Sequence, residues 1–363
     1  RYIRTGHILY STMDGSLWVV PFDQDALAVT GPPALVSTGL PGTMVGPVNF
    51  AISESGTLVY ALESPTARRE LVWVGRDGQV EPFDTTWRAA FANPRLSPDG
   101  RRLAIVIREA SSSHIWIRNV AGGLASKLSL GTESNEEPAW EPNGRTVTYV
   151  SDVGDVWRRA VDGGASAVRQ IHTDRRLSEQ VWSPDGSWLV VRTSTPTLGS
   201  GDIMGFRTTV PGDSALILSS RHTEYTPTIS PDGRWMAYSS FEAGRQEIFV
   251  VPFPVPGTLK WQISTQGGMA PSWSPRGDEI FYLDQSANLV AAQVSTTPEF
   301  ALRGSQVLFS AAPYIMTAVS RRNYDVSADG RRFLMVRPAG ADAGVRLVVV
   351  ENWFEELKTR KPQ

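Results

Sequence analysis

A four-residue turn that recurs seven times constrains the fold of this 363-residue chain more than any other feature. Each copy begins with Ser or Glu and ends with Gly, and five of the seven have Pro in the second position. The copies lie at residues 53–56, 97–100, 141–144, 183–186, 230–233, 274–277 and 327–330. Their first residues are separated by 44, 44, 42, 47, 44 and 53 positions, so one repeating architecture uses nearly the whole chain.

The residues of the turn predict its geometry. In Ser97-Pro-Asp-Gly100, Pro fixes φ, Asp can hydrogen-bond to its own backbone, and Gly accepts a positive φ, as expected for a type I turn. A large apolar residue precedes each turn, and an alternating run such as residues 102–107 follows it. Each copy therefore predicts a β-hairpin.

Two further strands complete each copy. An aliphatic residue beside a bulky one marks the third strand, and a weaker apolar run such as residues 215–218 marks the fourth. The third-strand pairs are Val72-Trp73, Ile115-Trp116, Val156-Trp157, Ile203-Met204, Ile248-Phe249 and Leu289-Val290. Four strands in roughly 45 residues are the period of a β-propeller blade.

We therefore predict an all-β chain that forms a single domain over residues 1–363, a β-propeller of four-stranded antiparallel blades. Residues 41–322 supply six complete blades. The strands of residues 1–40 pair with those of residues 323–350 in a closing blade, which leaves no open sheet edge. Seven blades fit this pairing best, and six or eight remain open. Residues 351–363 form a short amphipathic C-terminal helix and tail, with Trp353 and Phe354 docked on the outside.

The Ser-Pro-Asp-Gly hairpins resemble the WD-repeat-like units of TolB-type propellers over nearly all of the chain. Two stretches also resemble the C-terminal propeller region of bacterial serine/threonine protein kinases. One is Gly6-His-Ile-Leu-Tyr10 with residues 18–23, and the other is residues 324–336 with Asn352-Trp-Phe-Glu-Glu-Leu357. In that family a kinase domain and a membrane span precede the propeller. The resemblance implies a sensor or interaction arm outside the inner membrane, periplasmic or on the cell surface, tethered through an upstream segment.

Two alternatives stay open, because free periplasmic TolB-like scaffolds and the gating propellers of prolyl-oligopeptidase-type peptidases share the hairpin. The chain has no Gly-x-Ser-x-Gly elbow of an intact peptidase, and no Gly-rich loop, His-Arg-Asp or Asp-Phe-Gly of a kinase. Because the chain starts at Arg1 without Met, we expect it to be part of a longer protein. Residues 358–363 are typical of a natural end, which disfavours a following hydrolase domain.

Composition excludes several classes of function. The formal net charge is −2, from 35 basic and 37 acidic residues without a basic stripe, so no nucleic-acid partner is expected. The absence of Cys excludes thiol catalysis and Cys-based zinc sites. No apolar run approaches the roughly 20 residues of a membrane span, so no membrane contact by this chain is expected. We expect the partner to be a protein, a small peptide or another ligand on one propeller face.

No catalytic constellation is predicted, so we expect neither an enzyme nor a cofactor. The four His residues lack metal-ligand spacing, and the repeated Asp residues are explained by their role in the turns. Asp152-Val-Gly-Asp155 resembles a fragment of a calcium loop. Such residues are also typical of an ordinary hairpin connector, and no metal site is predicted.

The candidate binding residues lie four positions before each turn, where the chain enters the innermost strand, or one position earlier. Innermost strands line the central tunnel of a propeller, so these side chains are predicted to surround one of its mouths. The set is Asn49, Asn93, Glu136, Glu137, Glu179, Tyr225 and Asn323.

Amides, three Glu and a Tyr predict a weakly acidic, hydrogen-bonding funnel for a cationic or amide-bearing ligand such as a peptide end. The alternative is that these positions are polar because they are solvated. The longer segment of residues 311–322 is a second candidate for partner contacts.

Overall fold

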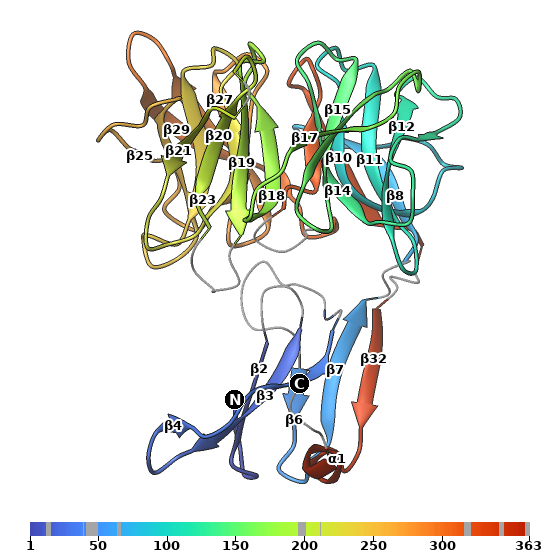
Figure 1. Ribbon diagram of the computed structural model, residues 1–363, viewed down its shortest axis with the longest axis vertical. Helices are drawn as coiled ribbons and strands as arrows, with labels where there is room; N and C mark the ends of the chain where they lie inside the picture. Colours follow the sequence, from blue (N-terminus) through green and yellow to red (C-terminus); the bar gives the residue numbers. More distant parts are fainter. Residues whose placement is uncertain are drawn as a thin grey trace. The chain divides into compact units, whose positions relative to one another are not determined.

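The computed structural model describes residues 1–11, 16–38, 40, 50–63, 67–194, 201–210, 212–315, 321–340 and 345–359. The chain forms two compact units, which differs from the single propeller domain that the sequence predicted. Unit 1 contains the two ends of the chain, Arg1–Ala67 and Gly340–Gln363, and unit 2 contains Arg68–Ile315 and Val319–Ala339. Figure 1 labels many of the strands in both units.

Unit 2 consists of six four-stranded antiparallel sheets, which we number as blades 1 to 6. Blades 1 to 3 contain β10 (Ala90–Leu96), β11 (Arg102–Arg108), β12 (Ser113–Asn119) and β13 (Ser126–Lys127); β14 (Asn135–Trp140), β15 (Thr146–Ser151), β16 (Val156–Ala160) and β17 (Val168–Ile171); and β18 (Arg176–Trp182), β19 (Trp188–Ser194), β20 (Ile203–Arg207) and β21 (Ser214–Leu218).

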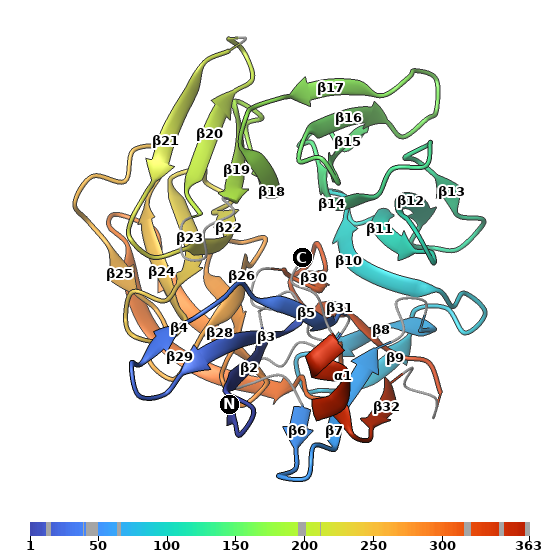
Figure 2. The same ribbon diagram turned by 60° about the horizontal axis from the view of Figure 1, so that its bottom comes forward.

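Blades 4 to 6 contain β22 (Glu224–Ile229), β23 (Trp235–Ser240), β24 (Glu247–Pro252) and β25 (Trp261–Gln262); β26 (Met269–Trp273), β27 (Glu279–Leu283), β28 (Asn288–Ser295) and β29 (Ala301–Ser310); and β30 (Tyr324–Val326), β31 (Arg332–Pro338), β8 (Arg69–Gly75) and β9 (Val80–Pro82). The blades form a ring in which the first strand of each blade lies nearest the middle (Figure 2). The all-β propeller of antiparallel four-stranded blades is therefore confirmed.

The repeated turn joins the first two strands of every blade and has the predicted chemistry. The N–H of Gly100 donates to the carbonyl oxygen of Ser97 at 2.7 Å, and the φ of Gly100 is +69°. Asp99 Oδ1 accepts the hydroxyl of Ser97 at 2.5 Å and the N–H of Arg101 at 3.0 Å. Both hydrogen bonds lower the pKa of Asp99, and the one from Ser97 has the larger effect. The turn thus accounts for its own Ser, Asp and Gly.

Neighbouring blades pack face to face through apolar side chains. Between blades 1 and 2, Val106 and Ile115 are fully buried against Trp140 and Tyr149, which belong to one hydrophobic cluster. Trp273 lies in the corresponding cluster between blades 4 and 5. Burial of such large rings stabilises both of these blade junctions.

The predicted way of closing the ring is wrong. The described strands form six blades in unit 2, and β30 and β31 pair with β8 and β9 rather than with strands of residues 1–40. Seven consecutive residue pairs join β31 to β8, from Arg332↔Gly75 to Pro338↔Arg69. The β6–β7 and β30–β31 hairpins carry the same turn signature, so the repeat alone does not say which of them continues into β8.

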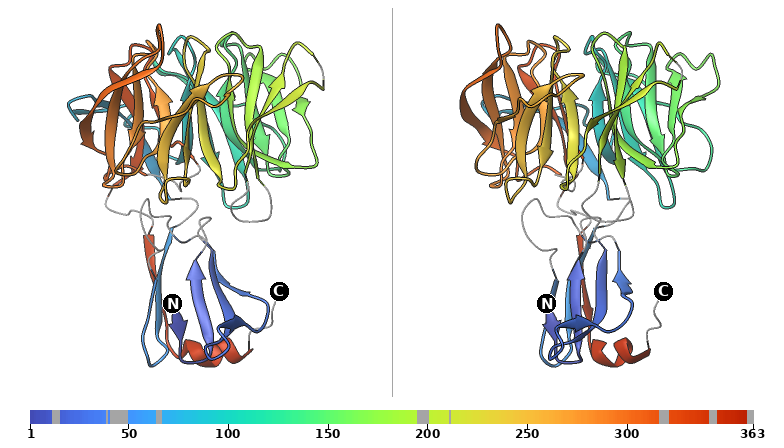
Figure 3. Two further views of the ribbon diagram at one scale, coloured as in Figure 1. Left: turned by 90° about the vertical axis from the view of Figure 1, so that its left-hand side faces the viewer. Right: turned by 60° about the vertical axis from the view of Figure 1, so that its left-hand side comes forward.

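Unit 1 contains the remaining strands, in two sheets with a common core. One sheet contains β1 (Tyr2–Ile3), β2 (His7–Ser11), β3 (Leu17–Asp23), β4 (Ala28–Val29) and β5 (Ala34–Ser37), and the other contains β32 (Val345–Val350), β7 (Leu58–Glu63) and β6 (Phe50–Ile52). In Figure 3 the two sheets face each other, with α1 (Trp353–Thr359) at one end. The remaining copy of the turn, at residues 53–56, is the first along the chain and joins β6 to β7.

The predicted C-terminal helix is present, but its docking was predicted wrongly. Trp353 is fully buried in the core of unit 1 together with Leu9 and Leu58, rather than on the outside of a propeller blade. Within the described part of the chain, no helix has the length and hydropathy needed to cross a membrane.

We predict that a fragment of residues 68–339 unfolds as one cooperative propeller, because it retains both halves of blade 6. A fragment of residues 68–315 lacks β30 and β31, so β8 loses its seven paired residues and the ring loses two buried strands. Circular dichroism during heating should show a sharp transition for the first fragment alone. Equal cooperativity in both fragments would contradict this account of closure.

Candidate functional site

The inner rim of unit 2 is formed where the chain enters the first strand of each blade. In blade 1, Asn93 and Pro94 lie opposite a single residue of β11, which is a β-bulge. Equivalent register shifts occur in blades 2 to 5. Pro follows the bulged residue in four blades, where its missing N–H costs no ladder hydrogen bond because the first strand is a sheet edge. We call the aligned positions the bulge ring: Asn93, Glu137, Glu179, Thr226, Ala270 and Asn323.

Four members of the bulge ring are held in a strained backbone conformation. The φ angles of Asn93, Glu137, Thr226 and Ala270 are +48°, +52°, +48° and +52°. Asn adopts this region readily, but Glu, Ala and especially β-branched Thr do so at a cost on the order of 1–2 kcal/mol each. Such strain persists only where neighbouring contacts offset it.

Hydrogen bonds between adjacent blades provide that compensation. Asn323 Oδ1 accepts the backbone N–H of Asn93, and Glu179 Oε2 accepts the backbone N–H of Thr226. Every blade junction has at least one hydrogen bond between the innermost strands of the two blades. The pairs are Asn323 with Asn93 (2.8 Å), Asn93 with Glu137 (2.5 Å), Glu137 with Gln180 (2.7 Å), Glu179 with Thr226 (2.9 Å), Thr228 with Trp273 (3.3 Å) and Ala270 with Tyr324 (2.8 Å).

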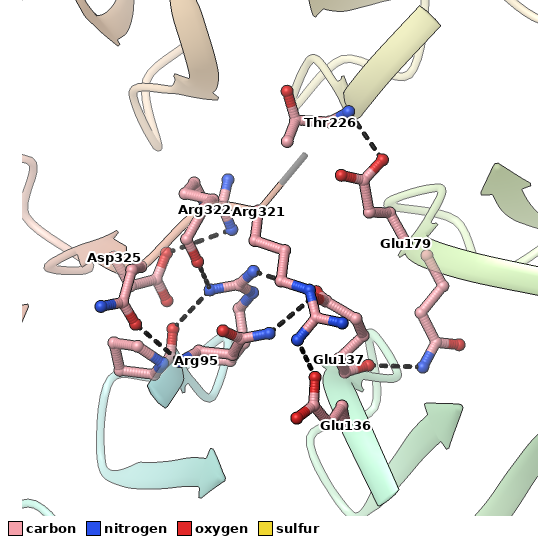
Figure 4. Close-up of polar contacts among 12 residues, drawn as sticks. Arg95, Glu136, Glu137, Glu179, Thr226, Arg321, Arg322 and Asp325 are labelled. Atoms are coloured by element: carbon pink, nitrogen blue, oxygen red, sulfur yellow. Dashed lines mark hydrogen bonds and ion pairs between the residues drawn. The ribbon is translucent and has the colours of Figure 1, made fainter. Parts of the chain in front are cut away.

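Arginines complete the inner rim, several of them drawn in Figure 4. The sequence pointed to two of them, Arg321 and Arg322, as part of the segment of residues 311–322. Arg192 Nε donates to Glu179 at 2.7 Å, and Arg95 lies 3.8 Å from Glu137. The guanidinium of Arg321 pairs with Glu136 through Nη1 and lies 3.4 Å from Glu137 Oε1 through Nε. Glu136 is also paired with Arg108 at 3.3 Å, and Arg322 with Asp325 at 3.4 Å.

The predicted acidic funnel therefore does not describe the charge of the inner rim. Four carboxyl groups (Glu136, Glu137, Glu179 and Asp325) face five arginines (Arg95, Arg108, Arg192, Arg321 and Arg322). The arginines come from strands and loops at positions that do not recur from blade to blade, so the repeat carried no signal for them. Arg322 alone lies beside a bulge-ring residue, Asn323, as Glu136 lies beside Glu137.

Burial shifts the titration of this cluster. Burial raises the pKa of Glu137 to about 7, with Arg95 opposing the shift and Glu179 adding to it. Burial also raises the pKa of Glu179, although Arg192 opposes this. Burial lowers the pKa of Arg95 to about 10, and the crowded surroundings of Arg321 lower its pKa to about 10 as well, although 36% of its side chain is exposed. Near neutral pH Glu137 is therefore partly protonated, because burial disfavours its charged form.

Some polar atoms of the rim remain without a partner although they are buried. Asn93 is fully buried and its Oδ1 has no hydrogen-bond partner among the described residues. Glu179 is 5% exposed and its Oε1 is likewise unpartnered, as is Oε1 of the neighbouring Gln180. All three atoms are hydrogen-bond acceptors, and leaving a buried acceptor unpaired costs about 1–3 kcal/mol. The inner rim is thus ready to accept hydrogen bonds from a donor group.

The predicted site residues fall into three groups. Asn93, Glu137, Glu179 and Asn323 are buried in the inner rim, which contradicts the alternative that they are polar because they are solvated. Glu136 and Tyr225 are partly exposed at the same rim, where the guanidinium of Arg192 lies 5.1 Å from the ring of Tyr225. Asn49 lies outside the described residues. Most of the second candidate, residues 311–315 and 321–322, is described, and its last two residues reach the rim.

The loop that resembles a calcium site contains an ion-paired carboxylate. Asp155, in the loop that resembles a calcium site, is paired with His172 at 2.7 Å and Arg169 at 3.4 Å. A cationic guanidinium on this carboxylate disfavours a second cation there. Among the described residues, no group of three or more His, Asp or Glu side chains could hold a metal ion.

Comparison with known proteins shows which chains share this fold. The family described as the TolB beta propeller domain matches residues 78–277, more than half of the chain. An uncharacterized protein of Agrobacterium fabrum is 28% identical over 224 residues, which cover 57% of this chain and 74% of that protein. The uncharacterized peptidase YuxL of Bacillus subtilis is 26% identical over 203 residues, and the match spans only 30% of its length.

A solved structure supports the same fold. The putative TolB from Agrobacterium tumefaciens superposes with a TM-score of 0.56 at 18% identity, covering 76% of this chain and 99% of that one. At this identity the likeness concerns the fold and not the ligand. It agrees with unit 2 as a propeller of the TolB type.

We predict that part of the pH dependence of stability comes from Glu137. Its pKa is about 7 in the folded protein, against an ordinary value of 4.5, so the folded state binds more protons between these limits. The stabilisation present below about pH 4.5 is therefore lost as the pH rises through 7. For the parent chain, the free energy of unfolding in urea should be lower at pH 8 than at pH 5. Glu137→Gln should reduce this difference by on the order of 1–3 kcal/mol.

Two further variants separate this effect from a general one. Burial also raises the pKa of Glu224 to about 7. Glu224 should therefore lower the free energy of unfolding by a similar amount between pH 5 and pH 8, and Glu224→Gln should remove this contribution. Glu81 is 71% exposed, so Glu81→Gln should leave the decrease unchanged. An equal pH dependence in Glu137→Gln and Glu81→Gln would contradict the assignment.

Proposed function

The chain belongs to the TolB beta propeller family, and we propose that it is a noncatalytic propeller that binds a protein or peptide at the inner rim of unit 2. The observation that carries this proposal is the pair of buried, unpartnered acceptors at the rim, Asn93 Oδ1 and Glu179 Oε1. They lie beside partly exposed Glu136 and Tyr225, which a partner can reach. Loops at one end of a rigid ring are a common place for such contacts.

The proposal of a noncatalytic role rests on what the candidate groups already do. The turn residue Asp99 is fully engaged by Ser97 and the backbone of Arg101. The carboxyl groups of the rim are paired with arginines and bridge blades, which is a structural use of charge. The raised pKa of Glu137 follows from burial, and structural ion-pair networks shift pKa values as catalytic sites do.

The biological setting that we propose is a sensor or interaction arm of a bacterial receptor-type serine/threonine kinase. Its support is the resemblance of four stretches to the propeller region of such kinases: residues 6–10, 18–23, 324–336 and 352–357. In this arrangement the propeller lies outside the inner membrane, in the periplasm or at the cell surface. A partner on the rim would change the association of the attached kinase domains.

A second candidate is a gating propeller of a prolyl-oligopeptidase-type enzyme. The match to the peptidase YuxL over 43% of this chain favours it. A free periplasmic scaffold is the third arrangement. The reading frame on both sides of this segment separates the three, since a kinase core with an apolar span, a hydrolase domain and a signal peptide alone each support a different one.

We predict that a photo-crosslinking residue at Tyr225 captures a partner in the cells that produce the protein. Tyr225 is partly exposed at the rim, so a bound protein or peptide should lie within reach of p-benzoylphenylalanine placed there. The control position is Arg331, which is exposed on the turn at the opposite end of the innermost strand. The expected result is a discrete adduct from position 225 and none from position 331.

The same experiment with Glu137→Gln and Glu179→Gln tests whether the rim itself recognises the partner. Loss of the adduct supports recognition by these carboxyl groups. The same adducts from positions 225 and 331, or none from 225, would overturn the proposed site.

A further inference from the structure

We propose, on the basis of the function proposed above, that the inner rim recognises an arginine side chain of its partner, which takes the place of Arg321 on Glu136 and Glu137. Arg321 is then an internal occupant of the site. The ligand is thus a guanidinium, and a residue of this chain competes with it.

The geometry of Arg321 is that of a bound guanidinium rather than of a blade contact. Its Nη1 pairs with Glu136 Oε2 and its Nε lies 3.4 Å from Glu137 Oε1, so one planar cation spans two adjacent carboxylates (Figure 4). The two acceptors are on β14 of blade 2, whereas Arg321 precedes β30 of blade 6. A guanidinium is suited to this task because its N–H groups form a fixed fork.

Arg321 is also the most accessible arginine of the rim. Its side chain is 36% exposed, compared with 14% for Arg95, 11% for Arg192 and 18% for Arg322. Of the arginines paired with these carboxyl groups, Arg321 is therefore the one that an incoming group can reach most easily.

Among the described residues, the unpartnered buried atoms of the rim are mostly acceptors, against one donor, Arg322 Nε, so a ligand that donates hydrogen bonds fits the rim better than one that accepts them. Glu179 is 5% exposed, and one of its oxygens bonds to Thr226 and Arg192 while the other has no partner. Glu137 lies on the neighbouring blade (Figure 4), and Glu179 is close enough to raise the pKa of Glu137. Buried Asn93 adds a second unpartnered acceptor. A guanidinium has five N–H donors, so it is suited to a site rich in acceptors.

Competition between Arg321 and a ligand predicts the direction in which the affinity for a guanidinium probe changes when Arg321 is removed. If Arg321 occupies the carboxylates most of the time, only a fraction of the sites is open, and the apparent affinity for an external guanidinium is the intrinsic affinity multiplied by that fraction. Removing the Arg321 side chain should therefore strengthen the binding of a guanidinium probe. A purely structural role for Arg321 predicts no such gain.

The test is an NMR titration of the full chain with N-acetyl-arginine amide, using N-acetyl-citrulline amide as the uncharged probe of the same shape. Arg321→Ala should bind the arginine probe about tenfold or more tightly than the parent chain, with shifts at the rim. The citrulline probe should not show this gain. Arg321→Gln serves as a second variant that keeps the bulk of the side chain, and its expected gain is the same.

Matched variants make the result specific. Adding Glu136→Gln and Glu137→Gln to Arg321→Ala should abolish the gain, and Arg331→Ala, a change at an exposed arginine of a distant turn, should behave as the parent chain. Equal affinity of the arginine probe for the parent chain and both Arg321 variants, or no binding to any of them, would overturn the inference. An adduct at position 225 together with such a result would leave the proposed function standing and remove only the arginine specificity.

Discussion

The position of each blade against the next depends on polar contacts between the innermost strands, with at least one at every blade junction. Apolar packing between blades supplies most of the stabilisation, but it is not directional and does not fix where one blade meets the next. The contacts from Asn323 to Asn93 and from Glu179 to Thr226 fix that position, since each uses a backbone N–H that the bulge removes from the β-ladder. Loss of either contact leaves a buried N–H without a partner.

The same residues limit what the inner rim can do. Charged groups at this depth must be paired, so every carboxyl group of the rim attracts an arginine, and the predicted acidic funnel becomes a network of nearly balanced charge. The proposed binding therefore acts through exchange of partners, not through a free acidic surface. The strained backbone at Glu137 and Thr226 shows that this arrangement is maintained against a local cost.

How far the sequence determines the structure depends on whether an interaction is local. The turn at Ser97–Gly100 is specified by four adjacent residues, and the bulge ring lies at a fixed distance from it, so both were predictable. The partner of β8 was not, because the β6–β7 and β30–β31 hairpins carry the same signature and only their packing decides between them. Arg321 lies in the longest interval between turns, in the segment of residues 311–322 that the sequence marked for partner contacts. Its pairing with Glu136 and Glu137 was not predictable, because it occupies no position of the repeat.

The most direct test of this account is amide hydrogen exchange at Asn93 and Thr226. Both N–H groups lie in bulges outside the ladder, so without the side-chain acceptors they should exchange as rapidly as loop amides. The account predicts strong protection in the parent chain, lost at Asn93 in Asn323→Ala and at Thr226 in Glu179→Ala, while the amides of β11 stay protected. Fast exchange at both positions in the parent chain, or protection that survives these substitutions, would contradict it.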